Sequence, residues 1–455
     1  MQTTHRLSAL YAAATLALSS CASSPAAVEL SQGTRRPLQF SQRAVAPAFA
    51  PVTPAQHAFT PADLDSYLSQ GLEHHPLILA ARADWQASHE RAAQVTAWPE
   101  PKLRYSEFLE SVETRTGPQE RRFALSQAIP FPGRLSAAGR VQESSALAMK
   151  ERVGVARLEI AQRIESAYYG YAFLAREIET VEGLLELMRG LEPVIQGRVR
   201  TGAGQEDLLR MQVEIGRLED DLASHQHRRR ALSARLAEAA HLPPTSGLLP
   251  LAVLEVPETL PVDSARLLTR ALDESPALGE LAARLQAAGQ AEELASYNKK
   301  PGFSVSLDYI QTGDARSPST LGSGEDPLAV GLSISLPVWT SSYAAAEREA
   351  RQRARAARER LDAGRRVLEA DLAEEIFRVD DAARRIVLFR DSLLPRARES
   401  FKLTLSSYRT ARAGVLDLID AERALFELEL SMWRACRDYY QGRARLKALV
   451  GGNSR

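Results

Sequence analysis

The second half of the chain repeats the first, and this repeat constrains the fold more than any other sequence feature. Matching segments occur in the same order, at an offset that drifts from 200 to 210 residues. The matches pair His75-Pro76 with Ser275-Pro276, Pro101 with Pro301, Ala124–Pro130 with Gly331–Pro337, and Gly204, Asp207, Leu208 and Gln212 with Gly414, Asp417, Leu418 and Glu422. A duplication with small insertions leaves this pattern. Chance similarity among Ala- and Arg-rich helices is the alternative, but it would not also preserve strands that end in proline.

Each copy has the same expected order of elements. A helix of about thirty residues (Thr60–Ala97; Ser264–Asn298) leads into a strand, an outer loop, a second strand and two long helices joined by a Gly-containing turn. The long helix of the second copy is expected from about Ser342 to Arg409, with an interruption only at Pro395. At about 1.5 Å per residue it approaches roughly 100 Å. The chain therefore builds something elongated.

The expected strands alternate between apolar and small or polar residues, which is the period of a β-strand. They cover residues 101–109, 121–129, 302–311 and 327–336, with outer loops at Glu110–Glu120 and Gln311–Asp326. The polar positions of the second pair are Ser304, Ser306, Asp308, Ser333 and Ser335. A half-buried sheet in a soluble domain is the commoner home of such strands. A length of about nine to eleven residues, however, suits a tilted membrane strand.

Four strands are too few to close a barrel in lipid, because single-chain barrels use at least about eight and open edges are very costly there. Beyond the N-terminal segment, no window approaches the roughly 20 apolar residues of a membrane helix. Any span is therefore expected to consist of strands, and a spanning chain must oligomerise.

The N-terminal segment resembles a bacterial lipoprotein signal. Arg6 and an apolar run from Leu7 to Leu18 precede Ser19-Ser20-Cys21, so residues 1–20 would be removed and Cys21 would be lipidated. Ala22, rather than Asp, follows the cysteine, which implies sorting to the outer membrane. An ordinary secretory signal with an incidental cysteine is the alternative, and it also exports the chain.

The remaining divisions follow from composition and from the repeat. Residues 21–61 are rich in proline and predict a lipid-anchored tether. The first copy is assigned to residues 62–250 and the second to residues 251–455. Lys+Arg and Asp+Glu balance at 57 each, so no net charge attracts nucleic acid. Cys436 is expected to pack within a helix.

An enzymatic function finds no support in the sequence. No Gly-x-x-x-x-Gly-Lys-Ser/Thr, Gly-x-Ser-x-Gly or His-Glu-x-x-His pattern occurs. His225 and His227 are two residues apart on an expected helix and point to different sides, and His74-His75 is interpreted as a surface pair. No catalytic residue, metal site or cofactor is therefore expected.

Taken together, the export signal, the duplication, the strand pairs ending in proline and the paired long helices resemble the outer membrane efflux proteins, the TolC-like ducts. The resemblance covers nearly all of residues 62–450. Its more specific parts are the strand-to-helix junction Leu125–Arg134 and the helix-tip motif Tyr408–Glu422, with a similar first tip at Arg200–Leu209.

The resemblance implies a mainly α fold with a membrane β-barrel. Three chains, each with a duplicated helix-strand-strand-helix unit, would form a twelve-stranded barrel that a long α-helical tunnel continues across the periplasm. Ser304, Ser306, Asp308, Ser333 and Ser335 would line the pore. The homotrimer, embedded in outer-membrane lipid, would be a passive exit path that meets a periplasmic adaptor (membrane fusion) protein and an inner-membrane pump.

The resemblance also implies roles for the helix tips. Residues expected to contact the adaptor are Arg200, Gly202, Gly204, Asp207, Leu208, Arg409, Gly414, Val415, Leu416 and Leu418. Asp417 and Asp420 share a helix face and match aspartates that line the periplasmic aperture in the family, so a trimer would present six carboxylates. A solvated or capping carboxylate near Gly414 is the alternative for Asp417. The first copy carries Arg210 in place of Asp420.

The cargo is the least constrained property. The junction Phe131–Arg134 resembles the branch of the family that serves heavy-metal cation pumps, which favours metal cations, whereas a drug or small-molecule duct is the alternative. A lipid-anchored periplasmic coiled-coil adaptor or scaffold is the rival class. Such a protein would have an anchor and long helices, but it would lack the four alternating strands.

Overall fold

A computed structural model describes residues 63–201, 204–243, 247–259, 262–317, 319–410 and 412–451, all within one unit, Thr60–Arg455. The predictions for Cys21, for the signal and the tether, and for Gly202 lie outside the described residues.

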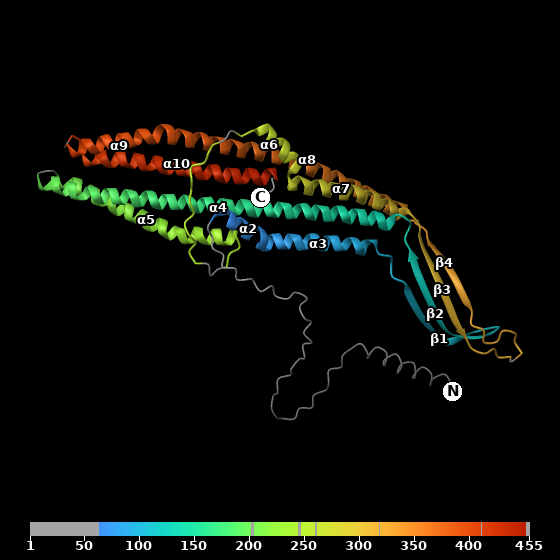
Figure 1. Cartoon of the computed structure of the whole chain (residues 1–455). Helices are drawn as coiled ribbons and strands as arrows, with labels where there is room; N and C mark the ends of the chain where they lie inside the picture. The colour runs from blue at the N-terminus through green and yellow to red at the C-terminus, as the bar shows by residue number, and fades with distance from the viewer. Residues whose placement is uncertain are drawn as a thin grey trace, which may run out of the picture. The chain divides into compact units, whose positions relative to one another are not determined.

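The order of elements occurs twice. The first series comprises α2 (Leu64–His74), α3 (Pro76–Thr96), β1 (Lys102–Thr114), β2 (Gly117–Ile129), α4 (Arg134–Arg200) and α5 (Gln205–Ala239). The second comprises α6 (Ser264–Glu274), α7 (Pro276–Ser296), the 3-10 turn η2 (Tyr297–Lys299), β3 (Gly302–Thr312), β4 (Leu328–Ser335), α8 (Thr340–Leu388), the π-helical segment η3 (Phe389–Leu393), α9 (Leu394–Arg409) and α10 (Val415–Val450). Within the unit the helices run side by side, and the strands extend from one end of the helical bundle (Figure 1). The mainly α fold is as expected.

The expected thirty-residue helices Thr60–Ala97 and Ser264–Asn298 were wrong, because each is broken before a proline. His75 (ψ 125°) and Ser275 (ψ 117°) are extended, and Pro76 and Pro276 begin the next helix. Proline lacks an N–H group and disfavours the helical conformation in the residue before it.

His75 is not the surface residue that was expected. Its side chain is 5% exposed, and its Nδ1 accepts a hydrogen bond from the Leu77 N–H at 3.2 Å. Burial lowers the pKa of His75, and the nearby His241 lowers it further. The ring therefore caps the start of α3 in its neutral form.

The long helices determine the length of the bundle. α4 contains 67 residues, or roughly 100 Å at about 1.5 Å per residue. α8 and α9 continue one another through η3, and Pro395 is the second residue of α9. Because Pro395 cannot donate a backbone hydrogen bond, the helix changes its pattern there instead of ending.

Hydrophobic clusters hold the helices together, and two of them are formed by described residues. The cluster near the turns includes Met188 of α4, Met211 of α5 and Leu418 of α10, and the other includes Ile386 of α8 and Cys436 of α10. Cys436 is fully buried, as expected, and burial raises its pKa to about 12.

Among the described helices, none offers an apolar stretch of membrane-spanning length.

The four strands form one antiparallel sheet in the order β1-β2-β3-β4. The central β2–β3 pair joins the two copies.

The expected outer loop Glu110–Glu120 was wrong, because β1 continues to Thr114 and β2 starts at Gly117. Gly117 has φ +136° and lies against the Gly313 backbone, where a Cβ atom would lie 1.7 Å from the carbonyl oxygen. Only glycine permits this short turn.

Candidate functional site

One face of the sheet is apolar and uncovered. The rows of paired residues on this face include Tyr105–Phe123–Tyr309–Leu328 and Leu103–Leu125–Leu307–Val330. Leu103 is 74% exposed and Val330 is 76% exposed. A contiguous apolar face of this kind needs an apolar medium or a partner surface.

The opposite face carries the polar positions identified from the sequence. The register places Ser304, Ser306, Asp308, Ser333 and Ser335 there. Asp308 accepts hydrogen bonds from Arg122 Nη2 at 2.8 Å and from Ser306 Oγ at 3.1 Å. That these residues line a pore remains a prediction.

Basic residues on this face were missed in the sequence. Three neighbouring rows of paired residues on this face start at Lys102, Arg104 and Ser106. Together they contain three basic residues, Lys102, Arg104 and Arg122, and one carboxylate, that of Asp308. A signal was present, because Lys102 and Arg104 alternate with Leu103 and Tyr105. The face is therefore more positive than the small and polar residues of the second copy alone suggest.

The sheet has two open edges. Within the described residues, β1 pairs only with β2, and β4 pairs only with β3. The outer N–H and C=O groups of an edge strand can pair with a further strand, and in lipid they must do so. One chain is therefore an incomplete sheet.

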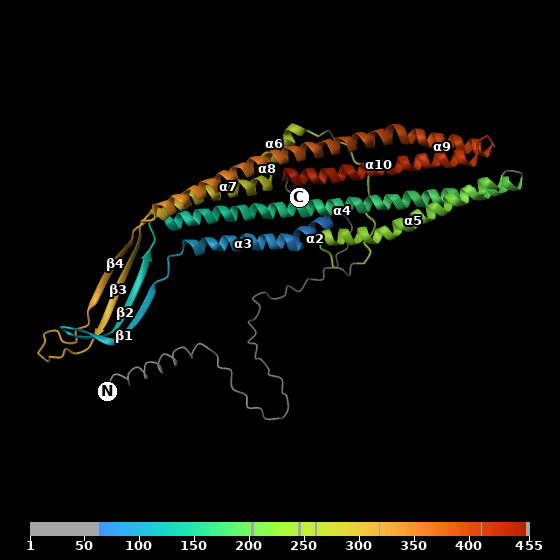
Figure 2. The ribbon, with the colours of Figure 1, turned by 180° about the vertical axis from the view of Figure 1, so that it is seen from behind.

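The helix tips lie at the opposite end of the bundle from the sheet (Figure 2). The Asp417 carboxylate accepts a hydrogen bond from the Gly414 N–H at 2.9 Å, so it caps the start of α10. Asp417 and Asp420 are both exposed. In the single chain Asp417 therefore acts as a helix-capping residue, which was the alternative given for it. That Asp417 and Asp420 line the periplasmic aperture of a trimer stays a prediction.

The residues expected to contact an adaptor divide by burial. Arg200, Gly204, Arg409, Gly414 and Leu416 are exposed, and Asp207 and Leu208 are partly exposed. Val415 and Leu418 are instead fully buried in the cluster near the turns. These two side chains pack inside the tip and leave no surface for a partner. The expectation that they contact an adaptor directly was therefore wrong.

Two contacts between the copies at the tips were missed. Arg198 Nη1 donates to the Tyr408 carbonyl oxygen at 3.1 Å, and its guanidinium carbon lies 4.5 Å from the centre of the Tyr408 ring. Arg423 Nε donates to Glu214 at 3.2 Å. Arg198 and Tyr408 are 210 residues apart, which is the offset of the repeat at the tips. The equal offset shows that Arg198 and Tyr408 are corresponding positions of the two copies, but nothing in the sequence indicated that they are in contact.

Comparison with known proteins agrees with this geometry. Residues 267–452 match the family model described as outer membrane efflux protein. No curated protein sequence matches the chain.

Several solved channels have a similar fold. The outer-membrane channel OprN aligns with a TM-score of 0.72 at 18% identity, covering 86% of this chain and 90% of its own. VceC, an outer membrane protein of Vibrio cholerae, aligns at 0.70 and 19% identity, covering 86% and 97%. The open state of the MtrE outer membrane channel of Neisseria gonorrhoeae aligns at 0.69 and 17% identity, covering 86% and 89%.

The chain therefore has the fold of the TolC-like outer-membrane channels, as the sequence resemblance indicated. Its second half carries an outer membrane efflux protein domain. The solved proteins that share this fold include outer-membrane channels.

Proposed function

We propose that three copies of this chain form an outer-membrane duct. The observation that carries the proposal is the four-stranded sheet, which has an exposed apolar face and two open edges. If β1 of one copy pairs with β4 of the next, three copies close a twelve-stranded barrel. The apolar face then meets lipid, and the face that carries Asp308 lines water.

The helices supply the rest of the proposed path. They continue the barrel as a tunnel, with the tips at the periplasmic end, where an adaptor and an inner-membrane pump would dock. The adaptor contacts that we retain are the exposed residues Arg200, Gly204, Arg409, Gly414 and Leu416. Three chains would bring six carboxylates, from Asp417 and Asp420, around the aperture. Transport through the duct is passive, and the pump supplies the energy.

The proposed anchor and the proposed division of the chain rest on the sequence. Lipidated Cys21 would hold the chain at the outer membrane, followed by the tether to residue 61. The two repeats would cover residues 62–250 and 251–455. The boundary between them lies within the segment that connects α5 to α6.

The cargo that we propose is a metal cation, on the resemblance of the junction Phe131–Arg134 to the heavy-metal branch. The junction also has a structural role. Gly133 has φ +88°, and a Cβ atom there would lie 2.6 Å from the Tyr297 hydroxyl. Deletion of the chain should therefore lower metal tolerance; unchanged metal tolerance with raised drug sensitivity would establish the drug-duct alternative instead.

Oligomeric state tests the duct itself. Chain with Cys21→Ser, purified without its lipid, should still require detergent and should have the mass of a trimer by light scattering corrected for bound detergent. It should also conduct ions in a planar bilayer. A monomer that stays soluble in buffer would rule out the barrel and favour a periplasmic adaptor or scaffold.

A further inference from the structure

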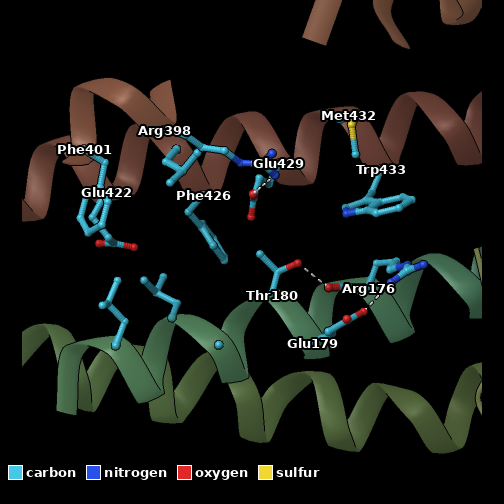
Figure 3. Close-up of a pocket in the computed structure, with 14 residues that line it drawn as sticks. Arg176, Glu179, Thr180, Arg398, Phe401, Glu422, Phe426, Glu429, Met432 and Trp433 are labelled. Atoms are coloured by element: carbon cyan, nitrogen blue, oxygen red, sulfur yellow. Dashed lines mark hydrogen bonds and ion pairs between the residues drawn. The ribbon is translucent and has the colours of Figure 1, made fainter. Parts of the chain in front are cut away.

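A cavity of about 390 Å³ lies between α4 on one side and α9 and α10 on the other (Figure 3). Its apolar lining includes Leu184 and Leu187 of α4, Phe401 of α9, and Phe426 and Trp433 of α10. Its polar lining includes Glu422, whose carboxylate is directed from α10 toward α4. The lining therefore combines apolar and aromatic side chains with charged ones, and Glu422 contributes an inward carboxyl group.

Glu422 has no partner in this cavity. Its side chain is 2% exposed, and neither carboxylate oxygen has a hydrogen-bond partner among the residues that the structure describes. Buried carboxyl groups are ordinarily hydrogen-bonded or ion-paired, because a solitary buried charge is very costly. The neighbouring Glu214, also buried, illustrates the rule by its ion pair with Arg423.

The other charges of the lining are already paired with each other. Arg176 donates to Glu179 at 2.7 Å, and Arg398 donates to Glu429 at 2.9 Å. Arg176 is also held by the Leu254 carbonyl oxygen at 2.7 Å and lies 4.3 Å from the centre of the Trp433 ring. Of the three glutamates in the lining, Glu422 is therefore the one that neither arginine pairs with.

We propose that this cavity binds a monovalent organic ammonium ion with an apolar body. The ammonium group would pair with Glu422, and the apolar body would pack against the rings of Phe401 and Phe426. A hard divalent cation needs several convergent oxygen ligands, and Glu422 is the one carboxylate of the lining without a basic partner. Aromatic rings stabilise an organic cation both by burial and by cation–π attraction.

The first copy of the repeat has no equivalent of this group. Gln212 is the counterpart of Glu422, and it is exposed and donates to Glu192 at 3.0 Å. The proposed site therefore belongs to the second copy, and it does not depend on the duct function or on the cargo.

The test is isothermal titration of full-length, detergent-purified chain with 1-naphthylmethylamine and with its neutral isostere 1-naphthylmethanol. The amine should bind wild type more tightly than the alcohol does. Glu422→Gln should weaken amine binding by about tenfold or more, because a charge-assisted pair is lost, and should leave alcohol binding unchanged. Glu427→Gln removes an exposed charge from the same helix and should change neither. Equal amine affinity for wild type and Glu422→Gln, or no amine binding to wild type, would overturn the proposal.

A second measurement needs no substitution at Glu422. Burial and the charge of Glu214 raise the pKa of Glu422 to about 8, so without a cationic partner the carboxyl group is mostly protonated at neutral pH. Pairing with an ammonium ion would displace that proton. Titrations near neutral pH in buffers with different ionisation enthalpies should therefore show release of close to one proton per amine bound. Binding without proton release contradicts a site at Glu422.

Discussion

The two copies of the repeat share a backbone but differ in charge at both ends of the molecule. Gly204 and Gly414 occupy the same N-cap position, before α5 and α10. At the tips, the first copy places Arg210 in an ion pair with Glu206, whereas the second places Asp420 at the equivalent position. Duplication has thus kept the positions of the turns while their side chains diverged.

The strands show the same divergence. The first hairpin contributes Lys102, Arg104 and Arg122 to the polar face, and the second contributes Asp308 among serines. The Arg122–Asp308 pair joins the two hairpins. On the polar face of the sheet the basic residues therefore come from the first copy and the carboxylate from the second, and at the equivalent tip positions the first copy has Arg210 and the second has Asp420.

The largest expected effect concerns Glu422 and its exposed counterpart Gln212. The pKa of Glu422 is raised to about 8 by burial and by Glu214, and Arg423 opposes the shift only in part. The folded state therefore binds more protons than the unfolded state between about pH 4.5 and about pH 8. Over that range this group should lower the free energy of unfolding by up to about 1.4 kcal/mol per pH unit as pH rises.

Thermal unfolding in detergent, followed by helical circular dichroism, measures this slope. Glu422→Gln should flatten the decline of the midpoint with pH, and Gln212→Glu at the exposed position of the first copy should add no decline. Equal slopes for wild type and Glu422→Gln would show that the carboxyl group finds a partner or water.

The next largest expected effect is the loss of stability when Arg423 is removed. Its removal leaves Glu214, which is 5% exposed, without its cation and beside Glu422. Because the Arg423 side chain is 43% exposed, solvent reduces the loss, and we expect Arg423→Ala to cost about 2 kcal/mol. Val213, its counterpart in the first copy, is 72% exposed, so Val213→Ala should be nearly neutral in the same unfolding measurement. A similar loss for both variants would refute this account.

The charges at the tips should control block by polyvalent cations. Asp417→Asn with Asp420→Asn removes six charges from a trimer while it keeps an oxygen that can cap α10, so a trivalent lanthanide ion should block roughly tenfold less tightly in a planar bilayer. Arg210→Asp in the first copy should act in the opposite direction. If neither change alters the block, these residues do not surround an aperture.

The strand charges should set ion selectivity in the proposed barrel. Arg122→Gln removes three positive charges from a trimer and should shift the reversal potential in a KCl gradient toward cation preference. Asp308→Asn should shift it toward anion preference. The same sign for both variants would contradict the assignment of this face to the lumen.

Sequence periodicity predicted the strands and the long helices because both have repeating side-chain patterns. It did not predict the breaks at His75 and Ser275, although Pro76 and Pro276 were visible, because apolar periodicity continues across them. Nor did it predict the turn after Thr114, which depends on how closely Gly117 approaches another loop.

The site was predictable only where its residues are adjacent in sequence. Alternation separated Ser306 and Asp308 from their apolar neighbours, and spacing put Asp417 and Asp420 on one helix face. The partnerless state of Glu422 and the contact between Arg198 and Tyr408 depend on packing between helices of different copies. No local pattern records such packing.

The smallest expected effect is the loss of stability on removing the side-chain hydrogen bond that caps α10 at the second tip. The Asp417 side chain accepts a hydrogen bond from the Gly414 N–H at 2.9 Å, whereas among the described residues no side chain caps the start of α5, where Asp207 is the counterpart. Asp417→Ala should therefore lower the free energy of unfolding by about 1 kcal/mol, and Asp207→Ala should change it by less than about half of that. Thermal midpoints of the two variants measured side by side provide the test, and Asp417→Asn, which keeps an acceptor oxygen, should recover most of the loss. Because Asp207 and Asp417 lie in the first turns of equivalent helices, equal losses would mean that helix-dipole attraction, and not the hydrogen bond to Gly414, accounts for the stabilisation.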